Sequence, residues 1–214
     1  KITAGAKRPD DFMSFWRNAI ALAEKTPLGV ELEPLPSFTK AGKYAAFKVS
    51  WNAPFGRLYG FLSIPEKPKP LPAEVTVCWA GPGFTQPVIS SDNVVLSLNI
   101  HNYDPANAAE AYKKMNEGEL CNTEISTKYM YMGLEDREKL YFYHGIVGCV
   151  RAVKWLASLP EVDSKRIGYF GISQGGGFGL ILGGLCGNFK TIVVAVPALC
   201  DQQAGLFGKL QQAS

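Results

Sequence analysis

Apolar and polar positions follow two different periods along the first third of the chain. Residues 10–25 place apolar side chains three and four positions apart, which predicts an amphipathic helix. Residues 43–51 and 57–64 alternate with a period of two, and the turn-forming residues 52–56 between them predict an antiparallel hairpin. The proline-rich residues 67–72 predict an extended connector, because proline fits neither a helix interior nor a central strand.

After this connector the pattern changes to short apolar runs rich in β-branched residues, which are typical of strands buried on both faces of a parallel sheet. Runs with helical spacing separate them. Strands that alternate with helices predict an α/β fold with a mostly parallel sheet, helices on both faces and an N-terminal antiparallel extension. Strands are expected at residues 75–79, 94–100, 166–170 and 191–196, helices at 105–115, 136–159 and 173–186, and a loop at 122–132.

The composition is that of a folded protein without a strong charge bias. Apolar residues make up 47% and charged residues 19% of the 214 positions, which excludes a disordered chain. A formal charge of +3, with both signs interspersed, gives no reason to expect nucleic acid or an anionic membrane as partner. The uncharged stretch 167–189 is diluted by glycines and polar residues, so we interpret it as protein core and not as a membrane span. We expect one domain over residues 1–214, with an extension at 1–72 and the core at 73–214.

The cysteines form no Cys-x-x-Cys pair, which argues against a zinc ribbon or a thioredoxin-like site. Four of the five lie in apolar runs, where a free cysteine behaves as a small buried hydrophobic residue; the five are Cys78, Cys121, Cys149, Cys186 and Cys200. No metal or organic cofactor is expected. The chain begins at Lys1 without a start methionine or a signal-peptide pattern. This indicates a trimmed chain or a removed leader, and slightly favours a periplasmic or secreted protein over a cytoplasmic one.

Residues 171–175 read Gly-Ile-Ser-Gln-Gly and lie between a predicted strand and a predicted helix. This is the G-x-S-x-G pattern of a nucleophile elbow, in which the glycines leave room for a strained turn that lifts the serine hydroxyl above the sheet. The amides at the start of the helix then face the negative charge that develops during acyl transfer. We therefore predict that Ser173 is a nucleophile and that the Gln174 amide is the first oxyanion donor.

The alternatives to the elbow are a chance match and a nucleotide-binding motif. A serine that lies by chance in a strand-to-helix turn is the plain structural alternative. No Lys-Ser or Lys-Thr pair follows the glycines, which argues against a phosphate-binding P-loop. A dinucleotide fingerprint that would begin at Gly81 has Gln86 in place of its third glycine.

A second oxyanion donor is expected in the loop after an earlier strand. Residues 79–84, Trp-Ala-Gly-Pro-Gly-Phe, are the candidate. Pro82 has no amide hydrogen, so the donor is expected at Gly83 or Phe84. An ordinary turn without such a role is the alternative.

From residue 141 onward the chain resembles carbohydrate esterase family seven, the acetyl xylan esterases and cephalosporin C deacetylases, and its N-terminal helix and hairpin resemble that family too. The resemblance implies an α/β-hydrolase fold, removal of small acyl groups such as acetyl from carbohydrate hydroxyls, and the homo-oligomer typical of the family. It also implies Ser173 as nucleophile and Gln174 as oxyanion donor. The matching residues are Tyr141–Tyr143, Arg151–Val153, Leu156–Asp163, Arg166–Ile167, Gly171–Gly177 and Val196–Asp201.

The chain departs from that family at two places. Residues 99–103, Asn-Ile-His-Asn-Tyr, stand where the family usually carries an Arg-Gly-Gln motif. Residues 80–83, Ala-Gly-Pro-Gly, replace its His-Gly-Tyr segment. Both changes indicate a divergent branch and put the acyl and leaving-group specificity in question.

The partners of the nucleophile are missing from their usual positions. An α/β-hydrolase has the chain order nucleophile, acid, histidine, yet His101 and His144 both precede Ser173 and no histidine follows it. Asp201 is a weak candidate for the acid. We therefore expect a C-terminally truncated hydrolase that lacks the last strands, exposes a sheet edge and has almost no activity by itself.

The sequence thus predicts a serine carboxylesterase that removes acetyl or other small acyl groups from carbohydrates or related esters. Two alternatives stay open. A prolyl-peptidase-like or dienelactone-type hydrolase would share the elbow and the fold. A non-catalytic carbohydrate-binding protein that has lost its triad is favoured by the missing histidine.

Overall fold

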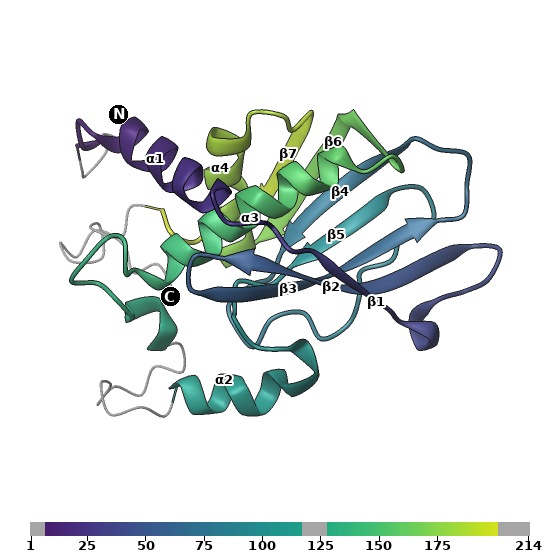
Figure 1. Cartoon of the computed structure of the whole chain (residues 1–214), viewed down its shortest axis with the longest axis horizontal. Coiled ribbons are helices and arrows are strands. Elements are labelled where there is room, and N and C mark those ends of the chain that lie inside the picture. The colour runs from purple at the N-terminus through teal and green to yellow at the C-terminus, as the bar shows by residue number, and fades with distance from the viewer. Residues whose placement is uncertain (1–6, 117–127, 201–214) are drawn as a thin grey trace.

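The computed structural model describes residues 7–116 and 128–200, which form one seven-stranded sheet with helices packed against it (Figure 1). The strands are β1 (Glu31–Pro34), β2 (Tyr44–Ala53), β3 (Gly56–Pro65), β4 (Leu71–Val77), β5 (Val94–Leu98), β6 (Val162–Ile172) and β7 (Thr191–Ala195), in the order β1-β2-β3-β5-β4-β6-β7. Neighbours from β1 to β5 pair antiparallel and those from β5 to β7 pair parallel. The predicted hairpin and parallel core are both present, although the parallel pairings are half of the total and not most of it.

The helices are α1 (Phe12–Glu24), α2 (Ala108–Asn116), α3 (Tyr141–Ser158) and α4 (Gln174–Cys186). α3 and α4 both contact β6, and they pack against each other through Phe142 and Phe178, whose ring centroids lie 6.1 Å apart. The two helices therefore cover the same face of the sheet, and α1 lies against α3 (Figure 1). Within the described ranges, the expected helical cover is present on this face. None of the helices in these ranges is long and apolar enough to cross a bilayer.

α3 begins later than the pattern of apolar residues predicts, at Tyr141 and not at Asp136. The Asp136 carboxylate accepts a hydrogen bond from the Glu138 amide at 2.9 Å, and the Asp136 carbonyl accepts one from the Leu140 amide at 3.0 Å. Aspartate favours such local bonds, which compete with helical ones. The helix therefore starts at Tyr141, one residue before Phe142, whose side chain is buried in the core.

The core lies between the sheet and the two helices α3 and α4. Every residue of β5 is buried, as predicted for a central strand. In β7, which is predicted as an apolar strand, four of the five residues are exposed. β7 forms an edge of the described sheet, so it has a neighbouring strand on one side.

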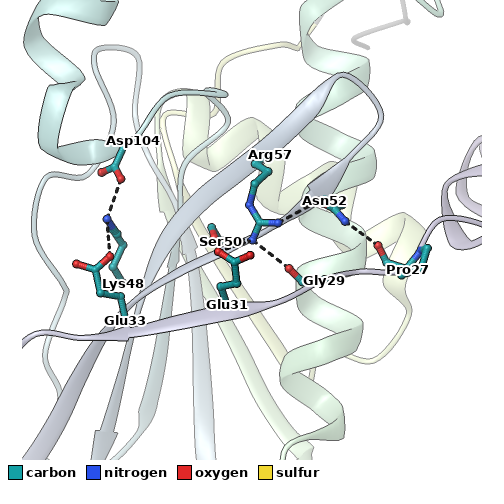
Figure 2. Close-up of polar contacts among 9 residues, drawn as sticks. All are labelled: Pro27, Gly29, Glu31, Glu33, Lys48, Ser50, Asn52, Arg57 and Asp104. Carbon is teal, nitrogen blue, oxygen red and sulfur yellow. Dashed lines mark hydrogen bonds and ion pairs between the residues drawn. The ribbon is translucent and has the colours of Figure 1, made fainter.

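Polar contacts link the strands of the N-terminal extension to one another and to Asp104, after β5 (Figure 2). Lys48 of β2 bridges Glu33 of β1, at 2.8 Å, and Asp104 after β5, at 2.7 Å. Burial would lower the pKa of Lys48, but the two carboxylates outweigh it and raise that pKa. Arg57 of β3 donates a hydrogen bond at 3.0 Å to the Gly29 carbonyl, just before β1. Because β3 also pairs with β5, the extension and the core share one sheet.

Candidate active site

Ser173 lies in the turn between β6 and α4, with φ 55° and ψ −120°. This conformation is strained for a residue that carries a β-carbon. A β-carbon on Gly171 would collide with the Gly175 carbonyl, and one on Gly175 would collide with the Val77 carbonyl of β4. Close backbone packing therefore requires both glycines of the G-x-S-x-G pattern, and the strained turn predicted here is present.

The backbone of Ser173 is fixed by three hydrogen bonds. Its amide donates to the Ala195 carbonyl at 3.0 Å, and its carbonyl accepts from the amides of Gly177, at 3.0 Å, and Ala198, at 2.8 Å. The turn is thus tied both to α4 and to the end of β7. The residue is half-buried, and its side chain makes no capping hydrogen bond with α4.

The N-terminus of α4 adjoins this hydroxyl. The amides of the first helical turn have no partner within the helix, and the helix dipole makes this end electropositive. No acidic side chain lies in the first turn of α4 to neutralise it. The Gln174 amide is the first of these donors in the chain. This arrangement suits the stabilisation of an oxyanion beside Ser173.

The loop of residues 79–84 lies at the same edge of the sheet, because β4 and β6 are parallel neighbours and their carboxyl ends coincide. Asn99, after β5, binds both backbone groups of Phe84: the Phe84 amide donates to Asn99 Oδ1 at 2.6 Å, and Asn99 Nδ2 donates to the Phe84 carbonyl at 2.9 Å. The Phe84 amide is therefore engaged. Among the described residues no hydrogen bond occupies the Gly83 amide, so Gly83 is the better of the two predicted donors.

The side chain of Gln174 joins the turn to this loop. Its nitrogen donates to the carbonyls of Cys78, at 3.2 Å, and Trp79, at 3.4 Å. Its oxygen accepts a hydrogen bond from the Tyr129 hydroxyl at 2.6 Å. Both Gln174 and Tyr129 are fully buried. Gln174 thus has a structural part in the site besides the predicted role of its amide.

A buried histidine contacts the middle of the loop. His101 Nε2 lies 2.9 Å from the Gly81 carbonyl, and His101 Nδ1 lies 2.7 Å from the Tyr141 hydroxyl. The imidazole stacks on Tyr103, with ring centroids 5.0 Å apart, and Tyr103 donates to the Pro82 carbonyl at 3.0 Å. Burial lowers the pKa of His101 to about 4, although the Gly81 carbonyl opposes this shift. His101 is therefore neutral near pH 7, and its Nε2 carries the proton because a carbonyl can only accept.

Neither histidine is hydrogen-bonded to Ser173. Both ring nitrogens of His101 are engaged elsewhere. In α3, His144 Nδ1 accepts from the Phe55 amide at 3.0 Å, and its buried Nε2 has no hydrogen-bond partner in the described part of the chain. Asp201, the candidate for the acid of the triad, lies outside the described residues. In residues 7–116 and 128–200 the site thus combines the strained turn with the N-terminus of α4, and no histidine there is hydrogen-bonded to Ser173.

Four of the five cysteines lie in the described residues. Cys78 and Cys149 are buried free thiols, as predicted, whereas Cys186 and Cys200 are half-buried and Cys121 lies outside the described residues. Burial raises the pKa of Cys78 to about 12, so this thiol is inert near neutral pH. No group of three histidine, cysteine or acidic residues in the described ranges could hold a metal ion.

A family model described as acetyl xylan esterase matches residues 2–207. The chain belongs to the acetyl xylan esterase family. The acetyl esterase Axe7A of Xylanibacter ruminicola is 31% identical to it over 204 residues, which cover 91% of this chain and 45% of that relative. The chain therefore spans about half the length of this family member.

Solved structures of the same family share the fold. An acetyl xylan esterase from Paenibacillus sp. R4 aligns with a TM-score of 0.76 at 22% identity, and acetyl xylan esterase 1 from Thermoanaerobacterium sp. JW/SL YS485 with a TM-score of 0.75 at 19% identity. Each alignment covers 99% of this chain and 66% of the solved chain. The fold is thus the α/β-hydrolase fold that the sequence predicts.

Several residues of this candidate site do not emerge from sequence patterns. Asn99, His101 and Tyr103 alternate at the end of a strand and replace a family motif, which could have indicated a shared role on one side of the chain. Tyr129 lies in a segment predicted as loop, where no local pattern marks it. Its role depends on its contact with Gln174, 45 positions away.

Proposed function

We propose that this chain carries the nucleophile of a serine carboxylesterase that removes acetyl or other small acyl groups from carbohydrates. The observation that carries the proposal is the conformation of Ser173, with φ 55° in a turn that two glycines permit and at the N-terminus of α4. Membership of the acetyl xylan esterase family supports the reaction class. That the substrate is a carbohydrate ester rests on the names of the relatives and on Trp79. Trp79 is 58% exposed and offers an apolar ring surface at the start of the loop of residues 79–84, called here the oxyanion loop.

In the proposed mechanism, Ser173 Oγ attacks the ester carbonyl while a histidine from outside these 214 residues takes its proton. The amides of Gln174 and Gly83 donate to the oxyanion of the tetrahedral intermediate. Collapse of the intermediate breaks the bond to the sugar oxygen, which leaves with the proton from the histidine. Water, deprotonated by the same base, then cleaves the acyl-enzyme and releases the carboxylate.

Because the proposed base is a histidine outside these 214 residues, the proposal predicts different activities for this chain and for the complete polypeptide. Loss of the histidine or the serine of a triad lowers turnover by roughly 10⁶ in a comparable serine hydrolase. The 214-residue chain alone is therefore expected to be nearly inactive, and the complete polypeptide encoded by its gene is expected to be active. The runner-up, a non-catalytic carbohydrate-binding protein, is favoured by the absence of a histidine bonded to Ser173 in the described residues.

A fluorophosphonate probe and an ester substrate test the proposal. In the complete polypeptide we expect covalent labelling of Ser173, hydrolysis of p-nitrophenyl acetate and release of acetate from acetylated xylan. We expect Ser173→Ala to abolish labelling and to lower kcat by about 10⁴-fold or more. The matched control is Ser158→Ala, which removes an exposed hydroxyl at the end of α3 and is expected to leave both unchanged.

The possible outcomes separate the candidate functions. A complete polypeptide that binds xylan but stays unlabelled would support the binding protein. Faster turnover of a peptide p-nitroanilide than of the acetate ester would support a prolyl-peptidase-like enzyme. Labelling at another serine would refute the assignment of Ser173.

A further inference from the structure

Four polar side chains bind five backbone groups of residues 79–84. His101 contacts the Gly81 carbonyl, Tyr103 donates to the Pro82 carbonyl, and Asn99 engages both backbone groups of Phe84. Gln174 donates to the carbonyl of the first residue of the loop. In the described part of the chain, the Gly83 amide has no such partner, while the Pro82 carbonyl before it and the Phe84 amide after it are both bound.

The two glycines of this loop do not fix its conformation by themselves, so contacts with other residues must hold it. Gly81 has φ 143° and Gly83 has φ 93°, and glycine visits many other conformations when nothing restrains it. Close packing also constrains the loop, since a β-carbon on Gly83 would lie 2.6 Å from Asn99 Oδ1. An oxyanion donor is effective only when it is oriented before the reaction. The polar side chains beneath the loop therefore decide whether the Gly83 amide can serve.

Among these supports His101 has the most restrictive geometry. It is fully buried, and its two nitrogens meet a carbonyl that can only accept and a tyrosine hydroxyl that can donate or accept. The Gly81 carbonyl thus selects the tautomer with the proton on Nε2, and the Tyr141 hydroxyl then donates to Nδ1. Tyr103 stacks on one face of the ring and Tyr129 meets it edge-on, with centroids 5.0 Å away in both cases.

We propose that His101 is a positioning residue of the esterase: its Nε2–H, oriented by the Tyr141 hydroxyl, holds the Gly81 carbonyl and thereby directs the Gly83 amide toward the oxyanion formed at Ser173. This inference rests on the proposed function of Ser173. His101 does not touch the substrate and does not take the serine proton. It occupies part of the segment in which this chain lacks the family's usual Arg-Gly-Gln motif, and it supplies a neutral support there.

The other histidine of the chain provides a matched control. His144 is equally buried and also forms one hydrogen bond to backbone, but to the Phe55 amide in the β2–β3 turn. If His101 served only the core, His101→Phe and His144→Phe would have similar consequences. If His101 positions the loop, only His101→Phe will change the chemistry at Ser173.

The kinetic test uses the complete polypeptide with p-nitrophenyl acetate. We expect His101→Phe to lower kcat by about 10²-fold, as removal of an oxyanion donor does, with KM changed less than about threefold. His101→Gln keeps an N–H donor, so its kcat should be at least about tenfold higher than that of His101→Phe. Tyr141→Phe, a milder change that removes one hydroxyl, should lower kcat by about tenfold. His144→Phe should lower the melting temperature but keep kcat within about twofold.

Hydrogen exchange of residues 79–84, measured by mass spectrometry on the 214-residue chain, tests the positioning without any activity. We expect His101→Phe to accelerate exchange in this loop by about tenfold or more and His144→Phe to leave it unchanged. A wild-type enzyme that is unlabelled at Ser173 would refute the esterase function, while this exchange result would still decide the role of His101. Equal exchange in the two variants, or kcat retained in folded His101→Phe, would overturn the inference.

Discussion

Ser173, Val196 and Leu199 are the non-glycine residues with positive φ in the described ranges. Val196 and Leu199 each directly follow a residue whose backbone is hydrogen-bonded to Ser173, namely Ala195 at the end of β7 and Ala198. Backbone strain is therefore gathered around a single turn. Residues held in such conformations cluster at functional sites, because the surrounding structure must compensate for a cost of about 1–3 kcal/mol each.

The glycines of α4 allow this strain to be tested by substitution. We expect Gly175→Ala to lower the free energy of unfolding by about 3 kcal/mol or more, because its β-carbon would meet the Val77 carbonyl of β4 and neither backbone can yield freely. Urea denaturation followed by circular dichroism measures the change.

Gly184→Ala is the control in the same helix. A β-carbon there would meet nothing within 4 Å, so the substitution should raise stability by about 0.5–1 kcal/mol through helix propensity. Equal effects of the two substitutions would show that close packing against β4 is not what requires glycine at position 175.

Among the elements, α3 connects the sheet to the N-terminal segment through a buried cation. Arg151 donates to the Asn52 carbonyl of β2 at 2.7 Å and to the Thr26 carbonyl after α1. The same helix carries the Tyr141 hydroxyl that orients His101. α3 therefore contacts both the N-terminal part of the chain, through Arg151, and the support of the proposed oxyanion loop, through Tyr141.

We expect Arg151→Met to lower the free energy of unfolding by roughly 3 kcal/mol, because it leaves two carbonyls without a charged donor while keeping most of the apolar volume. Thermal and urea unfolding measure this loss. Lys154→Met, one turn along α3, is the control: its ion pair with Glu24 is half-exposed, and the change should stay below about 1 kcal/mol. Similar losses in both variants would contradict the structural role of Arg151.

For the whole molecule, the two histidines predict a loss of stability in mild acid. Burial lowers the pKa of His101 and of His144 to about 4, compared with 6.5 for a free imidazole. Between these values the unfolded chain binds protons that the folded chain does not, so stability is full above pH 6.5 and falls as the pH decreases toward 4. The loss amounts to roughly 3 kcal/mol per histidine. Glu74, whose pKa burial raises, acts in the opposite sense near the acid end of this range.

Urea unfolding at intervals from pH 7 to 4.5 measures this dependence. His144→Gln removes one of the two groups, so we expect the slope of stability against pH to fall by about half, whatever the absolute stability of the variant. A stability that is constant over this range would show that the histidines are protonated in the folded protein.

Local patterns were sufficient for the elements and for the turn that carries Ser173. Strand and helix periods, and glycines at 171 and 175, depend on neighbours close in the chain, so the strand-turn-helix unit could be predicted with its strained serine. The start of α3 was wrong, because the Asp136 turn competes locally with the helix. The exposure of β7 follows from its place at an edge of the described sheet and not from its apolar sequence.

The support of the oxyanion loop could be recognised only once the chain was folded. His101 and Gly81 are 20 positions apart, and Tyr129 and Gln174 are 45 apart, so no periodicity links them. They meet because parallel pairing aligns the carboxyl ends of β5, β4 and β6 at one edge of the sheet. The choice between Gly83 and Phe84 likewise depends on Asn99, which reaches one of them across that edge. Side chains distant in sequence determine the environment of each backbone amide, and their positions follow from strand order.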